Sequence, residues 1–197
     1  MKSNEAHNNT LRAAFERYVT LSEDVWQDIR RRWHPERHPK NHWLTRVSET
    51  ECGFYLILTG VQRLYYLTPQ GNEVVLGFTF AGNFSGVYDS FIRQSPSQCY
   101  LQTLSETKLL AIGWSDLDEL FSRYAVMERW GRLFTQDILF GRVQREVELT
   151  TRTAEERYRD FTRRCPVPLQ QIPQKHLASY LNMTPETFSR LRANSIS

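Results

Sequence analysis

Side chains that could contact DNA bases and phosphates are gathered in one short stretch near the C-terminus. Between residues 174 and 192 the positions that are not apolar are mostly hydrogen-bonding types, and several carry a positive charge. Such groups can donate to phosphate oxygens and to base edges. The candidate DNA-binding residues are Gln174, Lys175, Thr184, Glu186, Thr187, Ser189, Arg190 and Arg192.

The apolar residues of the same stretch predict two short helices that would position those side chains. Leu177 and Leu181 are four residues apart, and Phe188 and Leu191 are three apart, so each segment offers one apolar face. Asn182 lies between them and tolerates a left-handed backbone better than most residues, which favours a helix end there. The spacing therefore predicts a break between two amphipathic helices.

Residue types also indicate where the second helix begins and where the two helices cross. Thr184 suits an N-cap and Pro185 the first helical position, where a missing N–H is tolerated. Ala178 is small where the two helices must approach closely. This is the helix-turn-helix pattern, whose second helix enters the major groove of DNA. The alternative is an ordinary helical hairpin, whose outer face is polar only because it faces water.

A second set of residues with possible chemistry consists of three histidines at a spacing of four. His34, His38 and His42 would form a metal-binding face on an unbroken helix, but Pro35 and Pro39 prevent that helix. We expect an ordinary solvated connection there and no metal site. The three cysteines are far apart and form no Cys-x-x-Cys pair, so neither zinc nor a disulfide framework is indicated.

The amino-acid composition is that of a globular protein, because 40% of the 197 residues are hydrophobic and 24% are charged. The net charge is only +3, but basic residues outnumber acidic ones from residue 151 onward, where the helix pair lies. No apolar run is long enough to cross a bilayer and the polar start is no signal peptide. We therefore expect a cytoplasmic protein with no membrane contact.

The segments before the helix pair predict helices, then a β-rich region. Leu11, Phe15, Tyr18 and Val19 form an apolar stripe, and a second helix should begin at Ser22. Short β-type runs separated by turn residues then favour a β-sandwich or barrel of the jelly-roll kind. The expected strands are 43–47, 54–58, 62–68, 73–80, 98–104 and 107–112.

A long helix with many large apolar residues should follow the β-rich region. These residues exceed what one roll and one helical hairpin can easily cover, so we expect the helix to pair with its copy across a two-fold axis. The alternative is that the helix simply lies against its own roll. Thr153 and Glu156 then form a capping box that opens the next helix. The candidate dimer residues are Met127, Trp130, Phe134, Ile138 and Val143.

This order of elements resembles the Crp/Fnr family of bacterial transcription regulators. The most specific motifs are residues 54–60, 81–86, 153–158 and 178–190. The resemblance implies an α+β fold in which an N-terminal jelly-roll sensor of the cyclic-nucleotide-binding kind is joined by a long dimerisation helix to a C-terminal helix-turn-helix domain. The corresponding boundaries are 1–124, 125–150 and 151–197.

The resemblance also allows a residue-by-residue reading of the phosphate-binding cassette. Gly82, Phe84 and Gly86 match it, but the carboxylate that would hold a ribose falls on Val87 and the phosphate-binding arginine on Ser97. Losing that charge-assisted contact removes about 1.5–3 kcal/mol, so we expect that cyclic AMP is not the effector. The degenerate effector pocket would comprise Phe84, Ser85, Gly86, Val87, Tyr88, Ser97, Gln98 and Cys99.

The same resemblance suggests no cofactor. Oxygen-sensing members carry a cluster of N-terminal cysteines, whereas here the first cysteine, Cys52, stands alone. Metal-dependent cupin enzymes share the roll, but their histidine ligands are missing because no histidine lies between His42 and His176. We therefore do not expect an enzyme.

The resemblance favours a homodimeric transcription regulator that reads a two-fold symmetric operator in double-stranded DNA. Glu186 and Arg190 fall on family positions that read base edges, while Pro185 replaces another base-reading residue, so the operator should differ. RNA polymerase is a further candidate partner. The effector is an unknown small molecule, or there is none and the roll is purely structural. The alternative is a ligand-sensing or protein-interaction module that no longer binds DNA, because no wing hairpin follows Arg192.

Overall fold

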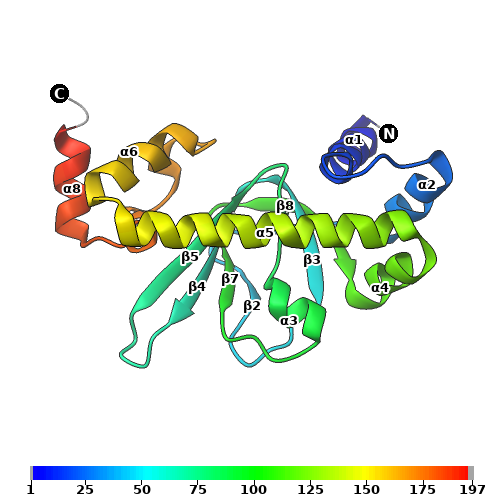
Figure 1. The fold of residues 1–197 in the computed structure, drawn as a ribbon, viewed down its shortest axis with the longest axis horizontal. Coiled ribbons are helices and arrows are strands. Elements are labelled where there is room, and N and C mark those ends of the chain that lie inside the picture. Colours follow the sequence, from blue (N-terminus) through cyan, green and yellow to red (C-terminus); the bar gives the residue numbers. More distant parts are fainter. Residues whose placement is uncertain (1, 195–197) are drawn as a thin grey trace.

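A single long helix, α5 (Ala125–Thr151), runs along the molecule and connects its two ends. The computed structural model describes residues 2–194 of the chain. The N-terminal helices α1 (Lys2–Glu16) and α2 (Glu23–Arg32) lie with α4 (Trp114–Arg123) at one end of α5, and α6 (Ala154–Arg164) and α8 (Pro185–Asn194) at the other (Figure 1). The β-roll lies across the middle. This confirms the expected order of roll, long helix and C-terminal helices.

The roll consists of two four-stranded antiparallel sheets, with strand orders β1-β8-β3-β6 and β2-β7-β4-β5. All six expected strands are present, and two short strands, β1 and β6, were not predicted. The tight turn between β3 and β4 needs Gly60, because its φ is 101° and an added Cβ would lie 2.6 Å from the Glu106 carbonyl oxygen. The strands are β1 (His34–His38), β2 (Trp43–Thr45), β3 (Gly53–Thr59), β4 (Val61–Leu67), β5 (Glu73–Phe80), β6 (Phe84–Ser85), β7 (Tyr100–Thr103) and β8 (Thr107–Gly113), with the short helix α3 (Tyr88–Arg93) after β6.

The histidine-rich segment is a strand rather than the solvated connection predicted from the sequence. β1 pairs with β8 in the register His34 to Ala111 and His38 to Thr107. It is an edge strand, where Pro35 is tolerated because the outer side of the strand needs no donor. The His38 and His42 rings stack at 4.7 Å. Within residues 2–194, no three or more His, Cys, Asp or Glu side chains form a group that could hold a metal.

An aromatic core joins the N-terminal helices, the roll and the first half of α5. Phe15 of α1 lies 4.6 Å from Trp130 of α5, and Phe84 of β6 lies 5.3 Å from it. The Trp130 and Phe134 rings stack at 5.1 Å between centroids. These rings are buried or partly buried, and their packing holds α5 against its own roll.

The two halves of α5 therefore have different environments, which corrects part of the dimer prediction. Met127, Trp130 and Phe134 are 0%, 1% and 8% exposed and belong to the core of their own chain. Trp130 and Phe134 contact the rings of Phe54 and Phe84 in the roll. Ile138 is half-buried at the border, whereas Val143 is 52% exposed. Among the described residues of α5, the exposed large apolar side chains all lie in the second half of the helix.

Among the described residues, no helix is long and apolar enough to cross a membrane.

Candidate nucleic-acid interface

The C-terminal helix pair has the geometry that the sequence predicts. Helix α7 (Gln174–Tyr180) ends in a left-handed residue, Asn182, with φ 50°. The Met183 N–H donates to the Ala178 carbonyl at 3.0 Å and the Asn182 N–H to the Ser179 carbonyl at 3.1 Å. These two hydrogen bonds are a Schellman ending, which satisfies carbonyls that the helix itself leaves free.

Helix α8 begins at Pro185, as expected, and Thr184 caps it. The Thr187 N–H donates to the Thr184 hydroxyl at 3.3 Å. Hydrogen bonds from its own backbone N–H and from Thr184 hold the pKa of the Glu186 carboxyl below its usual value. Because a carboxylate at this position also faces the positive end of the helix dipole, Glu186 is ionised and available to a donor.

The seam between the two helices is apolar and buried, so the polar residues face outward. Leu177, Ala178 and Phe188 are each 1% exposed. Gln174, Glu186, Ser189 and Arg190 are exposed and line one shallow hollow beside Pro185 and Ala193. The structure therefore brings together four of the predicted DNA-binding residues, from the start of α7 and the first two turns of α8.

The other predicted residues are placed differently. Thr184 is exposed but serves as the cap, and Thr187 is half-buried against it. Lys175 is exposed and its amine lies 4.0 Å from Glu73 of the roll. Arg192 is half-buried and lines a separate hollow of about 530 Å³ between α6, α7 and α8. These four residues are less well placed to contact a base.

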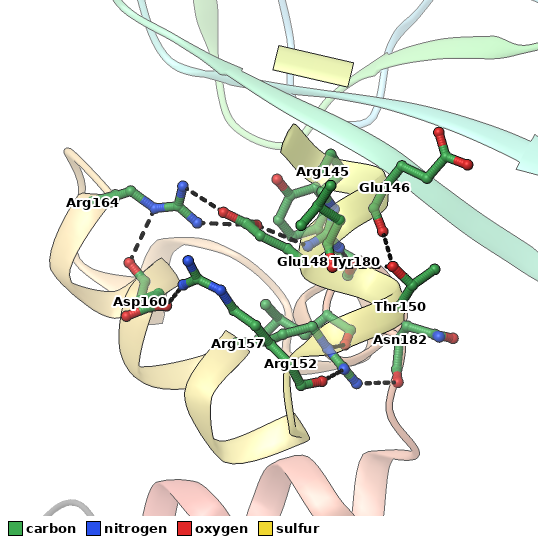
Figure 2. A network of polar contacts seen from close by, with 12 residues as sticks. Arg145, Glu146, Glu148, Thr150, Arg152, Arg157, Asp160, Arg164, Tyr180 and Asn182 are labelled. Carbon is green, nitrogen blue, oxygen red and sulfur yellow. Dashed lines mark hydrogen bonds and ion pairs between the residues drawn. The ribbon is translucent and has the colours of Figure 1, made fainter. Parts of the chain in front are cut away.

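A set of arginines that the sequence reading missed fixes the orientation of the helix pair. Arg157 of α6 donates to the carbonyls of Leu181 at 2.8 Å and Asn182 at 3.1 Å. Arg145 of α5 lies over the Tyr180 ring at 4.1 Å and donates to the Tyr180 carbonyl. Figure 2 shows these side chains converging from α5 and α6 on the end of α7. The carbonyls left free at a helix end are natural partners for arginine, but the sequence does not show which arginines reach them.

Ion pairs also join α5 to α6. The buried Glu148 carboxylate, on a residue 5% exposed, pairs with Arg164 at 2.9 Å, and Arg152 pairs with Asp160 (Figure 2). The α6 helix begins with the predicted capping box, in which the Thr153 hydroxyl accepts from the Glu156 N–H at 3.2 Å. The long helix and the helix pair are therefore connected by hydrogen bonds and charge rather than by apolar packing alone.

The predicted effector pocket is only partly assembled. A cavity of about 640 Å³ lies between the roll, α5 and α7, and Phe84 to Tyr88 and Cys99 line it. Ser97 is buried outside this lining, with its hydroxyl bonded to the Cys99 backbone N–H and carbonyl at 2.9 and 2.7 Å. Gln98 is exposed and also lies outside the lining. Two arginines that were not predicted, Arg142 and Arg145, border the cavity from α5.

A buried carboxylate beside the cassette was also missed. Glu51 is 1% exposed, and it accepts hydrogen bonds from the Val87 N–H at 3.1 Å and the Tyr55 hydroxyl at 3.1 Å. Burial raises the pKa of its carboxyl, while these hydrogen bonds act in the opposite direction. The Glu51 carboxylate thus already accepts the hydrogen bond of the Val87 N–H, which lies at the start of α3.

The comparisons with known proteins agree with this architecture. Residues 35–124 match the family model of the cyclic nucleotide-binding domain. The chain is 27% identical over 164 residues to the fumarate and nitrate reduction regulatory protein of Escherichia coli K12, covering 77% of this chain and 64% of that protein. The structure of FixK2 from Bradyrhizobium japonicum gives a TM-score of 0.72 at 19% identity, over 82% of this chain and 83% of that chain.

A second solved structure is similar over most of both chains. The c-di-GMP responsive global regulator CLP of Xanthomonas campestris gives a TM-score of 0.66 at 17% identity, over 88% of this chain and 91% of that chain. The fold of the chain is therefore that of these two solved structures, and two of the three named proteins, the Escherichia coli relative and CLP, are called a regulatory protein and a regulator. The chain is similar to these regulatory proteins in sequence and in fold. It spans 64% of the length of the Escherichia coli relative.

Proposed function

We propose that this protein is a DNA-binding transcription regulator that reads base edges with helix α8. The observation that carries the proposal is the exposed group Gln174, Glu186, Ser189 and Arg190, fixed on a helix whose opposite face is buried through Phe188. A guanidinium can donate two hydrogen bonds to guanine and a carboxylate can accept from cytosine. The relatives, which carry names of regulatory proteins, support the same function.

We further propose that two copies of the chain pair through the second half of α5. Phe140, Val143 and Val147 are 66%, 52% and 51% exposed, and their spacing places them on one face of the helix, next to Leu139 at 57%. An uncovered apolar stripe of this kind on a helix indicates a partner surface. A two-fold pair would present two copies of α8 to half-sites about 34 Å apart.

The effector proposed for the cavity is an apolar small molecule rather than cyclic AMP. The cavity wall is formed largely by apolar residues such as Phe54, Leu76 and Phe134. The position expected for a ribose-binding carboxylate is Val87, which is 2% exposed, and Ser97 lies outside the lining. Isothermal titration with cyclic AMP should therefore show no saturable binding at submillimolar concentration, and a micromolar Kd would contradict the proposal. RNA polymerase as a partner stays a prediction from the sequence.

The experiment for the function is selection of duplexes from a randomised pool by the purified chain, followed by titration of the selected duplex. We expect a two-fold symmetric site, selective binding over a random duplex, and affinity that falls as salt rises. Sedimentation should show a dimer, which Phe140→Asp disrupts. A chain that binds no duplex above background would support instead the module without DNA binding.

A further inference from the structure

A buried polar cluster joins the roll to the first helix of the DNA-binding pair. Its centre is Arg63 of β4, which is 3% exposed. The Arg63 guanidinium donates to both carboxylate oxygens of Glu73 at 2.7 and 2.9 Å and to the Gln102 side-chain oxygen at 2.7 and 3.0 Å. It also lies 2.8 Å from Nδ1 of His176 in α7, a residue 113 positions away in the chain.

The hydrogen-bonding chemistry of the Arg63 guanidinium determines the protonation state of His176. A guanidinium carries no acceptor, so the short contact requires His176 Nδ1 to accept and the proton to lie on Nε2 of a neutral ring. His176 is 5% exposed. Burial lowers the pKa of its imidazole to about 4, and the Arg63 charge acts in the same direction.

The other charged groups that face His176 do not reverse the lowering of its pKa. Glu73 of β5 lies 3.6 Å from Nδ1 and favours the protonated ring, while Lys175 of α7 disfavours it. Glu73 is already engaged by both arms of Arg63. The neutral ring is therefore the form that fits this contact between β4, β5 and α7.

The same face of α7 also completes the edge of a sheet. β5 is the outer strand of its sheet, and the Val75 N–H of that strand donates to the Ser179 hydroxyl at 2.9 Å. That hydroxyl in turn donates to the Glu73 carbonyl at 2.9 Å. The Phe78 ring of β5 lies 5.2 Å from Tyr180. Helix α7 thus takes the place of a neighbouring strand along the β4–β5 hairpin.

We propose that Arg63, Glu73 and His176 form a proton-sensitive latch that docks α7 on the β4–β5 hairpin, and that the docked arrangement is the one that binds a specific DNA site. The second part rests on the proposed function. In the docked arrangement Glu186, Ser189 and Arg190 are exposed, so docking leaves the reading surface open. Docking of α7 also fixes the direction of α8 before DNA binds, which reduces the conformational entropy lost on DNA binding.

Protonation opens the latch by a defined route. A proton on Nδ1 removes the acceptor that Arg63 uses and places a second cation against the guanidinium. The pKa of His176 in the docked state is about 4, below the value near 6.5 of a solvated histidine. Docking is therefore fully favoured above about pH 6.5, and it weakens as pH falls from there toward 4, by about tenfold between pH 7.5 and 5.5.

The direct test is amide hydrogen exchange at Val75, whose N–H is bonded to Ser179 only when α7 is docked. We expect its protection factor, corrected for the intrinsic exchange rate, to fall about tenfold from pH 7.5 to 5.5. The buried Leu109 amide of β8, remote from α7, serves as the control and should change little. A Val75 protection factor that does not depend on pH would overturn the latch.

A matched variant separates the histidine from other titrating groups. His176→Gln keeps an oxygen that can accept from Arg63 but does not titrate in this range. Val75 protection in this variant should be the same at both pH values. An equal loss of protection at pH 5.5 in the variant and the unaltered chain would assign the effect to another group and overturn the role of His176.

The link to DNA is tested by adding the selected duplex at pH 5.5. A ligand that binds the docked form must favour docking, so saturating duplex should raise Val75 protection, and a random duplex should raise it less. Protection that falls when the selected duplex binds would overturn the assignment of the docked form as the binding form. Failure of the proposed function is distinguishable, because the chain would then select no duplex while Val75 protection still responded to pH.

Discussion

The two ends of α5 are held by different kinds of contact. At its start, Trp130 and Phe134 pack among aromatic rings of α1 and the roll. At its end, Arg145 and Glu148 reach α6 and α7 through ion pairs and backbone hydrogen bonds (Figure 2). Aromatic packing does not titrate, whereas a buried polar contact depends on protonation and on each partner. The aromatic packing at the start of α5 is therefore insensitive to protonation, whereas the polar contacts at its end can respond to it.

Truncating the aromatic end should have the largest effect on stability. Trp130→Ala removes a ring that is 1% exposed and touches Phe15, Phe84 and Phe134. We expect the free energy of unfolding to fall by about 3–5 kcal/mol, because the ring leaves a cavity that its neighbours cannot fill. Urea denaturation measures this. Tyr66→Ala, at a side chain 38% exposed, should change little, and equal losses in both variants would contradict the comparison.

Disrupting the polar contact between the roll and α7 should lower the free energy of unfolding by an intermediate amount. Arg63→Met keeps most of the stem but leaves Glu73, Gln102 and His176 without their common donor. Since the Glu73 side chain is 33% exposed and can recover water, we expect a loss of about 2–3 kcal/mol rather than the full penalty of an isolated buried charge.

The control for Arg63→Met is an exposed ion pair on the same roll. Arg37 pairs with Glu106 at 2.7 Å, and their side chains are 67% and 55% exposed. Arg37→Met should lower the free energy of unfolding by less than about 1 kcal/mol. If Arg37→Met and Arg63→Met lower the free energy of unfolding equally, the buried Arg63 cluster contributes no more to stability than an exposed ion pair, which would contradict the prediction.

The sequence predicted local structure well and long-range contacts poorly. Asn182, Thr184 and Pro185 act within one or two turns of the backbone, so their roles in the helix pair could be read from their types alone. The β1 strand was missed because its two neighbouring prolines and its charges do not look like a strand, and only its position at a sheet edge makes them tolerable.

The candidate sites show the same limit. The partners of Arg63 come from β5, β7 and α7, and no periodicity connects positions so distant in the chain. The division of the apolar residues of α5 into buried and exposed ones could not be predicted either, because the helix carries large apolar residues on more than one face. Whether Trp130 or Phe140 is covered depends on which face of α5 the roll packs against.

The central claim is that α8 reads DNA through Arg190, and the most direct measurement compares two arginine variants on the selected duplex. Arg190→Ala should weaken binding by about 1–3 kcal/mol and relax the preference at one base pair of each half-site. Arg30→Ala, an exposed arginine of α2 at the opposite end of the molecule (Figure 1), should leave affinity and preference unchanged. Equal affinity and equal base preference of Arg190→Ala and the unaltered chain would contradict the claim.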